Sequence, residues 1–341
     1  MTVEQFGVVI NPHSKKNKRR PHRVERLQAI VGPYGIVRET RSLDELGDTL
    51  VDFRRRGLRY WVSDGGDGAL HWLINKGLET APDDPGFLPC ALPTNGGTID
   101  FVARKVGIVG HSDAILRRLT ERCREGATVP TREVDSLEMT GTRVVDGREV
   151  PYRRLAFAAA LAGVARNFFD LYYAAPTQGP VTIAKILACA ARSIILGATP
   201  LARIASFPPR WTRYIDTLAR PEKARVHIDG RELPWTEYTA LNVGAFKINT
   251  GGVVKVFTHA GNGKMHVIAG KPGHMELLAD LPMLLTGGKL REWNLWDGPA
   301  TSLEVDCPEG LDPVLDGEFL RGVRSMRIRP GPKIRIARVS G

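Results

Sequence analysis

The sequence lacks paired cysteines and long apolar runs. Its four cysteines stand far apart, at Cys90, Cys123, Cys189 and Cys307. That spacing excludes a zinc cluster built on cysteines and a disulfide framework, and it fits a reducing compartment. No apolar run approaches transmembrane length, and the chain enters a strand at Phe6 without a signal-like segment. We therefore expect a soluble, cytoplasmic protein.

Acidic residues are fewer than basic residues. Among 341 residues, 48 are lysine or arginine and 37 are aspartate or glutamate, so the net charge is +11. Such an excess suits an anionic partner: nucleic acid, an anionic membrane or a polyphosphate. Neither an RNA-binding signature nor interleaved aromatic residues accompany the basic cluster at residues 15–26. We therefore expect no nucleic-acid partner.

Residues 6–131 alternate between strand-like and helix-like patterns, as in a parallel α/β sheet. We predict helices over residues 24–31, 43–56, 69–78 and 113–124. A capping box of Ser42 and Glu45 opens the second helix, and Ser112 is expected to cap the fourth. We assign residues 1–132 to an α/β nucleotide-binding domain.

Residues 133–341 have a different texture, which predicts a β-rich acceptor domain. Short alternating runs recur, and Asp-Gly-Arg-Glu segments at Asp146 and Asp229 are typical of hairpin turns. The pattern indicates antiparallel sheets interrupted by a helical insertion. The last strands could return to pack beside the first domain. The fold class is thus α/β plus β-rich, in two domains.

Glycine-rich segments follow three predicted strands. They are Gly65-Gly66-Asp67-Gly68, Gly96-Gly97-Thr98-Ile99-Asp100 and, at the first strand, Asn11-Pro12-His13-Ser14. The carboxyl ends of parallel strands meet at one edge, where ligands bind. Glycine N–H groups and helix N-termini attract phosphate. Asp67 would repel phosphate, so it indicates a metal ion or a hydroxyl that must lose a proton.

Together these motifs resemble the diacylglycerol kinase catalytic-domain superfamily of soluble lipid kinases. This superfamily includes bacterial diacylglycerol kinase-like proteins, sphingosine kinases and ceramide kinases. The resemblance rests on Asn11-Pro12, Gly65-Gly66-Asp67-Gly68, Gly97-Thr98-Ile99-Asp100 and Asp316-Gly317-Glu318, in the family's order. Departures are Ala69 in place of a usual threonine, lysines at 15 and 16, and an aspartate at 100. His71 and the 97–102 segment are more similar to the sphingoid-lipid kinases.

The resemblance implies ATP and Mg²⁺ as cofactors and assigns roles to residues. Those implied at the nucleotide are Asn11, Ser14, Lys15, Gly65, Gly66, Gly68, Gly96, Gly97 and Thr98. Asp67 is the candidate base by similarity to sphingosine kinases, and Glu318 by similarity to bacterial diacylglycerol kinases. Asp316 is assigned to metal, and Asp100 to the acceptor or the metal. Three alternatives stay open: a charged turn at Lys15, a helix cap at Asp100 and a plain hairpin turn at Asp316-Gly317.

Asn167 lies where sphingosine kinases place an aspartate that holds the sphingoid headgroup. An amide removes the counter-charge for an amine, which favours a neutral headgroup such as that of ceramide. We therefore expect ATP-dependent phosphorylation of a lipid hydroxyl, with ceramide-like acceptors first and diacylglycerol second. The rivals are an NAD kinase, since NAD kinases share the Gly-Gly-Asp-Gly element, and a non-catalytic lipid- or nucleotide-binding protein.

An apolar segment at residues 181–196 carries only Lys185 and Arg192 as charges. Apolar, aromatic and arginine residues then alternate over residues 201–214. These features favour a lid over an acyl-chain pocket that touches an anionic membrane surface, although a core helix followed by a loop explains them equally well. We expect a lipid substrate and peripheral membrane association.

Overall fold

The computed structural model describes residues 5–12, 14, 17, 22–81, 84, 86–97, 99–198, 211, 213–250, 254–291 and 293–339. The chain forms two compact units. Unit 1 comprises Met1–Asp135 with Pro332–Gly341, and unit 2 comprises Ser136–Gly331. This division falls close to the one predicted at residues 132/133, and it assigns the C-terminal segment to unit 1. Each unit is described by itself.

Unit 1 is built on one six-stranded sheet in the order β2-β1-β3-β4-β22-β5. The strands are β1 (Phe6–Ile10), β2 (Gly35–Glu39), β3 (Tyr60–Asp64), β4 (Ala91–Pro93), β5 (Thr131–Val134) and β22 (Ile334–Ala337). Every pair is parallel except β22 with β5. The predicted parallel sheet is confirmed, and the last strand of the chain lies inside it.

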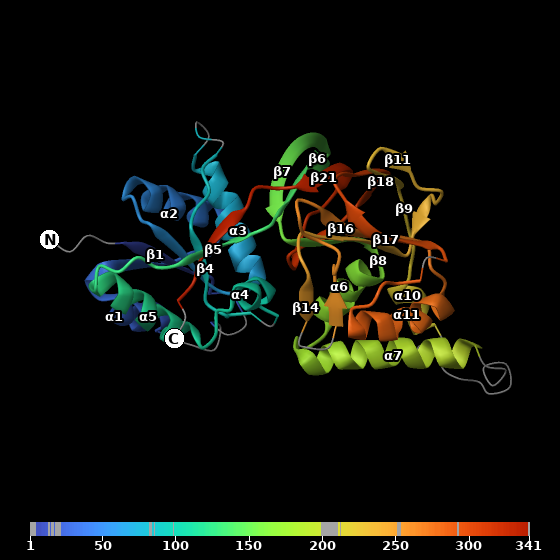
Figure 1. Ribbon diagram of the computed structural model, residues 1–341, viewed down its shortest axis with the longest axis horizontal. Helices are drawn as coiled ribbons and strands as arrows, with labels where there is room; N and C mark the ends of the chain where they lie inside the picture. The colour runs from blue at the N-terminus through green and yellow to red at the C-terminus, as the bar shows by residue number, and fades with distance from the viewer. Residues whose placement is uncertain are drawn as a thin grey trace. The chain divides into compact units, whose positions relative to one another are not determined.

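Helices cover both faces of this sheet. They are α1 (Arg23–Val31), α2 (Leu43–Arg55), α3 (Asp67–Glu79), α4 (Phe101–Val106) and α5 (Ser112–Arg124), with a 3₁₀ turn, η2, at Gly32–Tyr34. In Figure 1, α2 and α3 lie on one side of the sheet and α1 and α5 on the other. The predicted cap of α2 is confirmed, since Ser42 Oγ accepts from Glu45 N at 3.1 Å. Buried leucines, such as Leu46 and Leu50, turn α2 toward the sheet.

Unit 2 contains two six-stranded antiparallel sheets, as its alternating pattern predicted. Their orders are β11-β10-β18-β21-β6-β7 and β17-β16-β13-β8-β19-β20. The first comprises β6 (Leu137–Val145), β7 (Arg148–Ala156), β10 (Arg225–Ile228), β11 (Arg231–Glu232), β18 (Leu303–Leu311) and β21 (Val323–Pro330). The second comprises β8 (Ala158–Gly163), β13 (Ala240–Gly244), β16 (Met265–Gly270), β17 (Leu295–Ala300), β19 (Val314–Leu315) and β20 (Glu318–Phe319). Short pairs form from β9 (Glu222–Lys223) with β12 (Glu237–Tyr238), and from β14 (Ile248–Thr250) with β15 (Val254–Val256).

Two hairpins of unit 2 turn at the predicted Asp-Gly dipeptides. Asp146 and Gly147 have φ of 49° and 76°, and Asp229 and Gly230 have φ of 49° and 80°. Positive φ at both central residues is the type I′ geometry that fits the twist of a hairpin. The two-residue turns pair Val145 with Arg148 and Ile228 with Arg231, so the prediction is confirmed.

Four helices pack together in unit 2. They are α6 (Val164–Ala174), α7 (Pro180–Ala198), α10 (Tyr214–Leu218) and α11 (His274–Thr286). Figure 1 shows α7 along the edge of the unit, with α10 and α11 on one side of it. Ala190 and Ile194 of α7 join Ile215 and Leu218 of α10 in a buried cluster. Among the described residues, no helix combines the length and hydropathy that a membrane crossing needs.

Candidate active site

The carboxyl ends of β1, β3 and β4 lie side by side in unit 1. Ile10 pairs with Asp64, and Ser63 pairs with Pro93, so the three strands end at the same edge of the sheet. The glycine-rich segments that follow β3 and β4 are therefore neighbours, as the sequence predicted. This edge is where open α/β sheets bind ligands.

The two glycine pairs pack backbone against backbone. Gly96 N donates to Gly65 O at 2.9 Å. A Cβ added to Gly66 would lie 2.6 Å from Gly97 Cα, and one added to Gly96 would lie 2.7 Å from Gly65. Neither distance is possible for real atoms, so the loops can approach one another only as glycine. This steric demand is a reason for the glycines that is separate from contact with phosphate.

Asp67 connects two helices at this edge. It is the first residue of α3, and its carboxylate accepts from Phe101 N at 3.2 Å and from Val102 N at 3.3 Å, at the start of α4. Negative charge is stabilised at helix N-termini, and here two of them meet one half-buried side chain. The carboxylate thus already has a structural role. Both hydrogen bonds would weaken if the carboxyl group took up a proton, so Asp67 suits a metal ligand better than a base.

Asp100 closes the second glycine loop. Its Oδ1 accepts from Gly97 N at 2.9 Å, and the residue is 8% exposed with φ of 51°. It occupies the position before α4 but makes no capping hydrogen bond to that helix. The open alternative of a helix cap is therefore wrong in detail, because the side chain supports the loop instead. A direct contact of Asp100 with an acceptor stays a prediction.

The segment after β1 contributes Asn11 and Ser14. Ser14 N donates to Asn11 O at 3.2 Å. Asn17 Nδ2 donates to Asn11 O at 3.1 Å and to Asp64 O at 3.0 Å. Ser14 Oγ is buried, and within the described part of the chain it has no hydrogen-bond partner. A buried hydroxyl without a partner at this edge is compatible with a bound anion. Lys15 and Thr98, also predicted at the nucleotide, lie outside the described residues.

A buried ion pair lies beneath the first glycine loop. Arg23 reaches Asp64 with two hydrogen bonds of 3.0 Å, and both side chains are almost fully buried. Asp64 Oδ1 also accepts from Thr94 Oγ1 at 3.0 Å and from Ser112 Oγ. Asp64 directly precedes Gly65, so this network fixes the start of the loop. Sequence analysis missed it, since its members come from four separate segments.

The same network corrects one helix cap and extends to Asp113. Ser112 was expected to cap α5, but it is the first residue of that helix, and its hydroxyl donates to Asp64. Burial lowers the pKa of Arg23, but hydrogen bonds and charges from Asp64 and Asp113 outweigh burial and raise it. Burial likewise raises the pKa of Asp113, yet Arg23 and Arg26 leave it lowered. Arg23 and Asp113 are therefore held charged.

Unit 2 contains the other predicted residues, and Asp316 is the first of them. Asp316 and Gly317 have φ of 51° and 94° and join β19 to β20, as a third Asp-Gly hairpin turn. Asp316 is 6% exposed, and its carboxylate accepts from Phe157 N and Ala158 N, each at 2.9 Å. A buried carboxylate held by backbone amides anchors a turn. The assignment of Asp316 to a metal stays a prediction.

Glu318 follows that turn and is half-buried. Tyr173 of α6 donates its hydroxyl to Gly317 O at 2.8 Å and packs its ring against Phe319. Burial and then the charge of Glu318 raise the pKa of Tyr173 to about 12, so the phenol stays protonated. Glu318 is thus held beside a neutral phenol, where a carboxylate can accept a proton.

Asn167 uses its amide donors within the fold. The residue is 3% exposed, and Nδ2 donates to Leu218 O at 3.0 Å and Arg220 O at 3.1 Å. Both amide hydrogens are therefore used to attach the segment after α10 to α6. A headgroup contact of Asn167 stays a prediction, and it could be made only through Oδ1.

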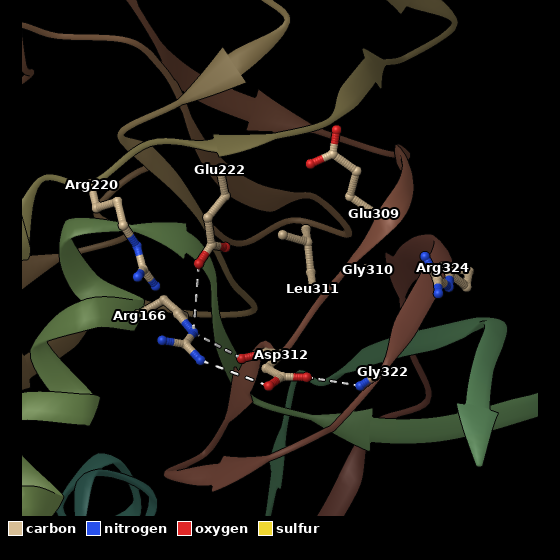
Figure 2. A pocket seen from close by; sticks show the side chains of 9 residues that line it. All are labelled: Arg166, Arg220, Glu222, Glu309, Gly310, Leu311, Asp312, Gly322 and Arg324. Carbon is tan, nitrogen blue, oxygen red and sulfur yellow. Dashed lines mark hydrogen bonds and ion pairs between the residues drawn. The ribbon is translucent and has the colours of Figure 1, made fainter. Parts of the chain in front are cut away.

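A polar cavity of about 310 Å³ lies beside Asn167. Figure 2 shows its lining residues, which are Arg166, Arg220, Glu222, Glu309, Gly310, Leu311, Asp312, Gly322 and Arg324. Arg166 is 3.9 Å from Glu222 and stacks over the Phe319 ring at 5.5 Å. Burial raises the pKa of Glu222, against the opposing charge of Arg166. Three arginines and three carboxylates suit a polar ligand and not an acyl chain.

Replacing Gly66 by alanine tests the packed glycine pairs. We expect Gly66→Ala to lower the free energy of unfolding by about 1–3 kcal/mol, since the new methyl group overlaps Gly97. ATP affinity should fall at least about tenfold, which corresponds to 1.4 kcal/mol. Denaturant titration and calorimetric ATP binding measure the two effects.

Gly47→Ala is the matched control. Gly47 lies within α2 with nothing near an added Cβ, and alanine is the better helix former by about 1 kcal/mol. This variant should be as stable as the wild type or more so, with unchanged ATP affinity. Equal behaviour of the two variants would show that the glycine pairs need not be glycine.

Comparisons with known proteins agree on the fold. No protein-family profile matches the chain, and no curated protein matches it. A structure provisionally named as a diacylglycerol kinase from Bacillus anthracis str. Sterne superposes with a TM-score of 0.60 at 14% identity, over 99% of this chain and 98% of that one. A diacylglycerol kinase from the same organism gives 0.53 at 13% identity, over 99% and 97%.

An NADH kinase from yeast, solved with NADH, superposes with a TM-score of 0.50 at 10% identity. The match covers 98% of this chain and 83% of that one. At such low identities, structural similarity establishes a shared fold. The chain therefore has the two-domain fold of these kinases, with an α/β unit and an antiparallel β unit.

Proposed function

We propose that this chain, which shares its fold with the kinases above, is an ATP-dependent kinase that phosphorylates a lipid hydroxyl. One observation carries the proposal: two glycine pairs pack together at the carboxyl edge of a parallel sheet, beside Asp67 at two helix N-termini. Backbone N–H groups and helix dipoles at such an edge suit phosphate groups.

Unit 1 would hold the nucleotide. The loops at Gly65–Gly68 and Gly96–Gly97 would surround its phosphates, and Ser14 Oγ would gain the partner that it lacks among the described residues. Magnesium commonly binds through one or two carboxylates plus phosphate oxygens. Asp67 fits that role, since its half-buried carboxylate lies at the N-termini of α3 and α4, beside the glycine loop. Bound Mg²⁺ would neutralise charge on the phosphates.

Glu318 is the proposed base, as the resemblance to bacterial diacylglycerol kinases implies. Glu318 is half-buried beside Tyr173, and its carboxylate can take the proton of an incoming hydroxyl. Asp67 was the preferred base by resemblance, but its carboxylate accepts two hydrogen bonds from α4, and these favour its charged form. We therefore assign proton removal to Glu318, and support of the phosphates and their metal to Asp67.

The acceptor is assigned to the lipids because of the outer face of α7. Val181, Lys185, Ala188, Arg192 and Ile195 are exposed along one stripe at helical spacing. This stripe joins apolar groups to two cations without an acidic residue, which suits an anionic bilayer. The preference for ceramide rested on His71, on the 97–102 segment and on Asn167, and the amide donors of Asn167 are occupied. Diacylglycerol therefore becomes the first acceptor to test, and ceramide the second.

Radiolabelled ATP offered with diacylglycerol, ceramide, sphingosine and NADH tests the proposal. We expect label in a chloroform-soluble product with diacylglycerol or ceramide. Label transferred to none of the lipids would contradict lipid phosphorylation. NADH belongs in the panel because the yeast NADH kinase shares this fold, and label in NADH alone would assign the activity to that class.

Charge reversal on α7 tests the contact with membranes. The variant Lys185→Glu with Arg192→Glu should bind anionic vesicles more weakly, since each cation near such a surface contributes about 1 kcal/mol. Together that is roughly a thirtyfold loss, to be measured by vesicle sedimentation at low salt. Arg148→Glu with Arg231→Glu, at two exposed hairpin ends, is the control of equal charge. Equal losses in both variants would mean that net charge, and not α7, binds the membrane. Arg203 and Arg210 of the predicted membrane segment lie outside the described residues.

A further inference from the structure

A histidine and an aspartate form a buried pair in unit 2. His266 of β16 and Asp297 of β17 are 2% and 5% exposed, and His266 Nε2 lies 2.5 Å from Asp297 Oδ1. The other oxygen of Asp297 accepts from Leu290 N at 2.8 Å. Adjacent strands thus hold the imidazole and the carboxylate in one orientation.

A second histidine joins the pair from the solvent side. His259 precedes β16 and is exposed, and its ring centroid is 4.8 Å from that of His266. One nitrogen from each ring and one oxygen of Asp297 lie within 4.8 Å of one another. Within the described residues, the His259 imidazole makes no hydrogen bond. The hydrogen bond between His266 and Asp297 therefore does not explain the position of the His259 ring.

A second buried carboxylate lies near this cluster. Asp280 of α11 is 6% exposed; burial raises its pKa, the backbone hydrogen bond and charge of Arg291 lower it, and the charge of Asp297 raises it. A cation placed at Asp297 would relieve that repulsion. Two imidazoles and a carboxylate are, moreover, a donor set that zinc accepts, with its remaining position filled by water.

We propose that His259, His266 and Asp297 bind a divalent transition metal, with Zn²⁺ as the expected ion. Zinc bonds of 2.0–2.2 Å place neighbouring ligand atoms about 3.4 Å apart. The exposed His259 can rotate to that spacing, and the 2.5 Å between His266 Nε2 and Asp297 Oδ1 must widen by about 0.9 Å. The metal would displace the proton between His266 Nε2 and Asp297 Oδ1. A neutral imidazole then carries its proton on Nδ1, so the 3.4 Å contact that Nδ1 accepts from His259 N would open. Leu290 N would then orient the carboxylate from outside the ligand set.

Calorimetry with ZnCl₂ on the untagged, chelator-treated chain tests the site. We expect one zinc ion per chain. His259→Ala should weaken its binding by more than about tenfold, at least the loss that removal of an outer-shell partner causes. The matched control is His274→Ala, because His274 is also exposed and lies 3.8 Å from a carboxylate of Asp216. It should bind zinc as the wild type does.

Cobalt substitution gives a second readout that does not depend on kinase activity. Co²⁺ bound by two imidazoles and a carboxylate should give visible absorption bands, which His259→Ala should remove. Absence of zinc binding by the wild type would overturn the proposal. It would also be overturned if His259→Ala bound zinc as tightly as His274→Ala, and the trio would then be a hydrogen-bonded pair with a neighbouring ring.

Discussion

The Asp67→Asn variant is expected to transfer phosphate at least about 100-fold more slowly than the wild type, since even an outer-shell partner of a metal contributes about 10- to 100-fold. Asparagine keeps the shape of aspartate but removes the charge that would support the phosphates and their metal. Its carbonyl oxygen can still accept one N–H from α4, so the fold should survive with a loss of about 1 kcal/mol. Steady-state kinetics and a denaturant titration measure the two effects separately.

Glu79→Gln is the matched control, because Glu79 ends the same helix and carries an exposed carboxylate. It should retain wild-type turnover. Glu318→Gln should also lose turnover, since it removes the assigned base. Normal turnover of Asp67→Asn would remove this residue from the site. If Glu318→Gln were equally unaffected, the Asp-Gly-Glu segment would be only a hairpin turn.

Asp64→Ala is expected to lower the free energy of unfolding by about 3–5 kcal/mol, the loss typical when one partner of a buried ion pair is removed. Arg23 would remain buried without its bidentate partner, and the hydroxyls of Thr94 and Ser112 would lose an acceptor. Urea unfolding followed by circular dichroism measures this loss.

Arg26→Ala is the companion variant, because Arg26 is largely exposed and its pairing with Asp113 is screened by solvent. We expect about 0–1 kcal/mol for it. The double variant Arg23→Met with Asp64→Leu should recover part of the loss in Asp64→Ala, since apolar groups replace both charges. Equal stability of Asp64→Ala and Arg26→Ala would show that the buried pair adds nothing to stability.

The parallel sheet, the hairpins and the meeting of the strand ends could be predicted because their signals are local. Alternating strand and helix patterns imply parallel strands, and Asp-Gly dipeptides favour the positive φ found at Asp146 and Asp229. By the same logic Asp316-Gly317 is a turn, so the open alternative for this segment was correct. The assignment of Asp316 to a metal came from the similarity of Asp316-Gly317-Glu318 to a family motif, and not from the local sequence pattern.

The network at Asp64 could not be predicted, because its partners are distant in the sequence. Arg23 is 41 residues away and Ser112 is 48 residues away. The contacts of Asn167 could not be predicted for a related reason. Its amide binds carbonyl groups 51 and 53 residues further on, which no local pattern reveals. Position in a motif suggested a ligand contact, whereas the packing of α6 against α10 decided what the side chain binds.

The backbone contact between the two glycine pairs has a thermodynamic consequence. Each loop is held by the other, so a phosphate would meet donors that are already ordered, and binding would cost little conformational entropy. Gly96 N and Gly97 N are already bonded to Gly65 O and Asp100 Oδ1, so their amide hydrogen exchange should be slow before ATP is added and should change little afterwards. Selectivity among nucleotides would then have to come from the parts that contact the base and the sugar, because the phosphate-binding loops leave no room for side chains that could discriminate.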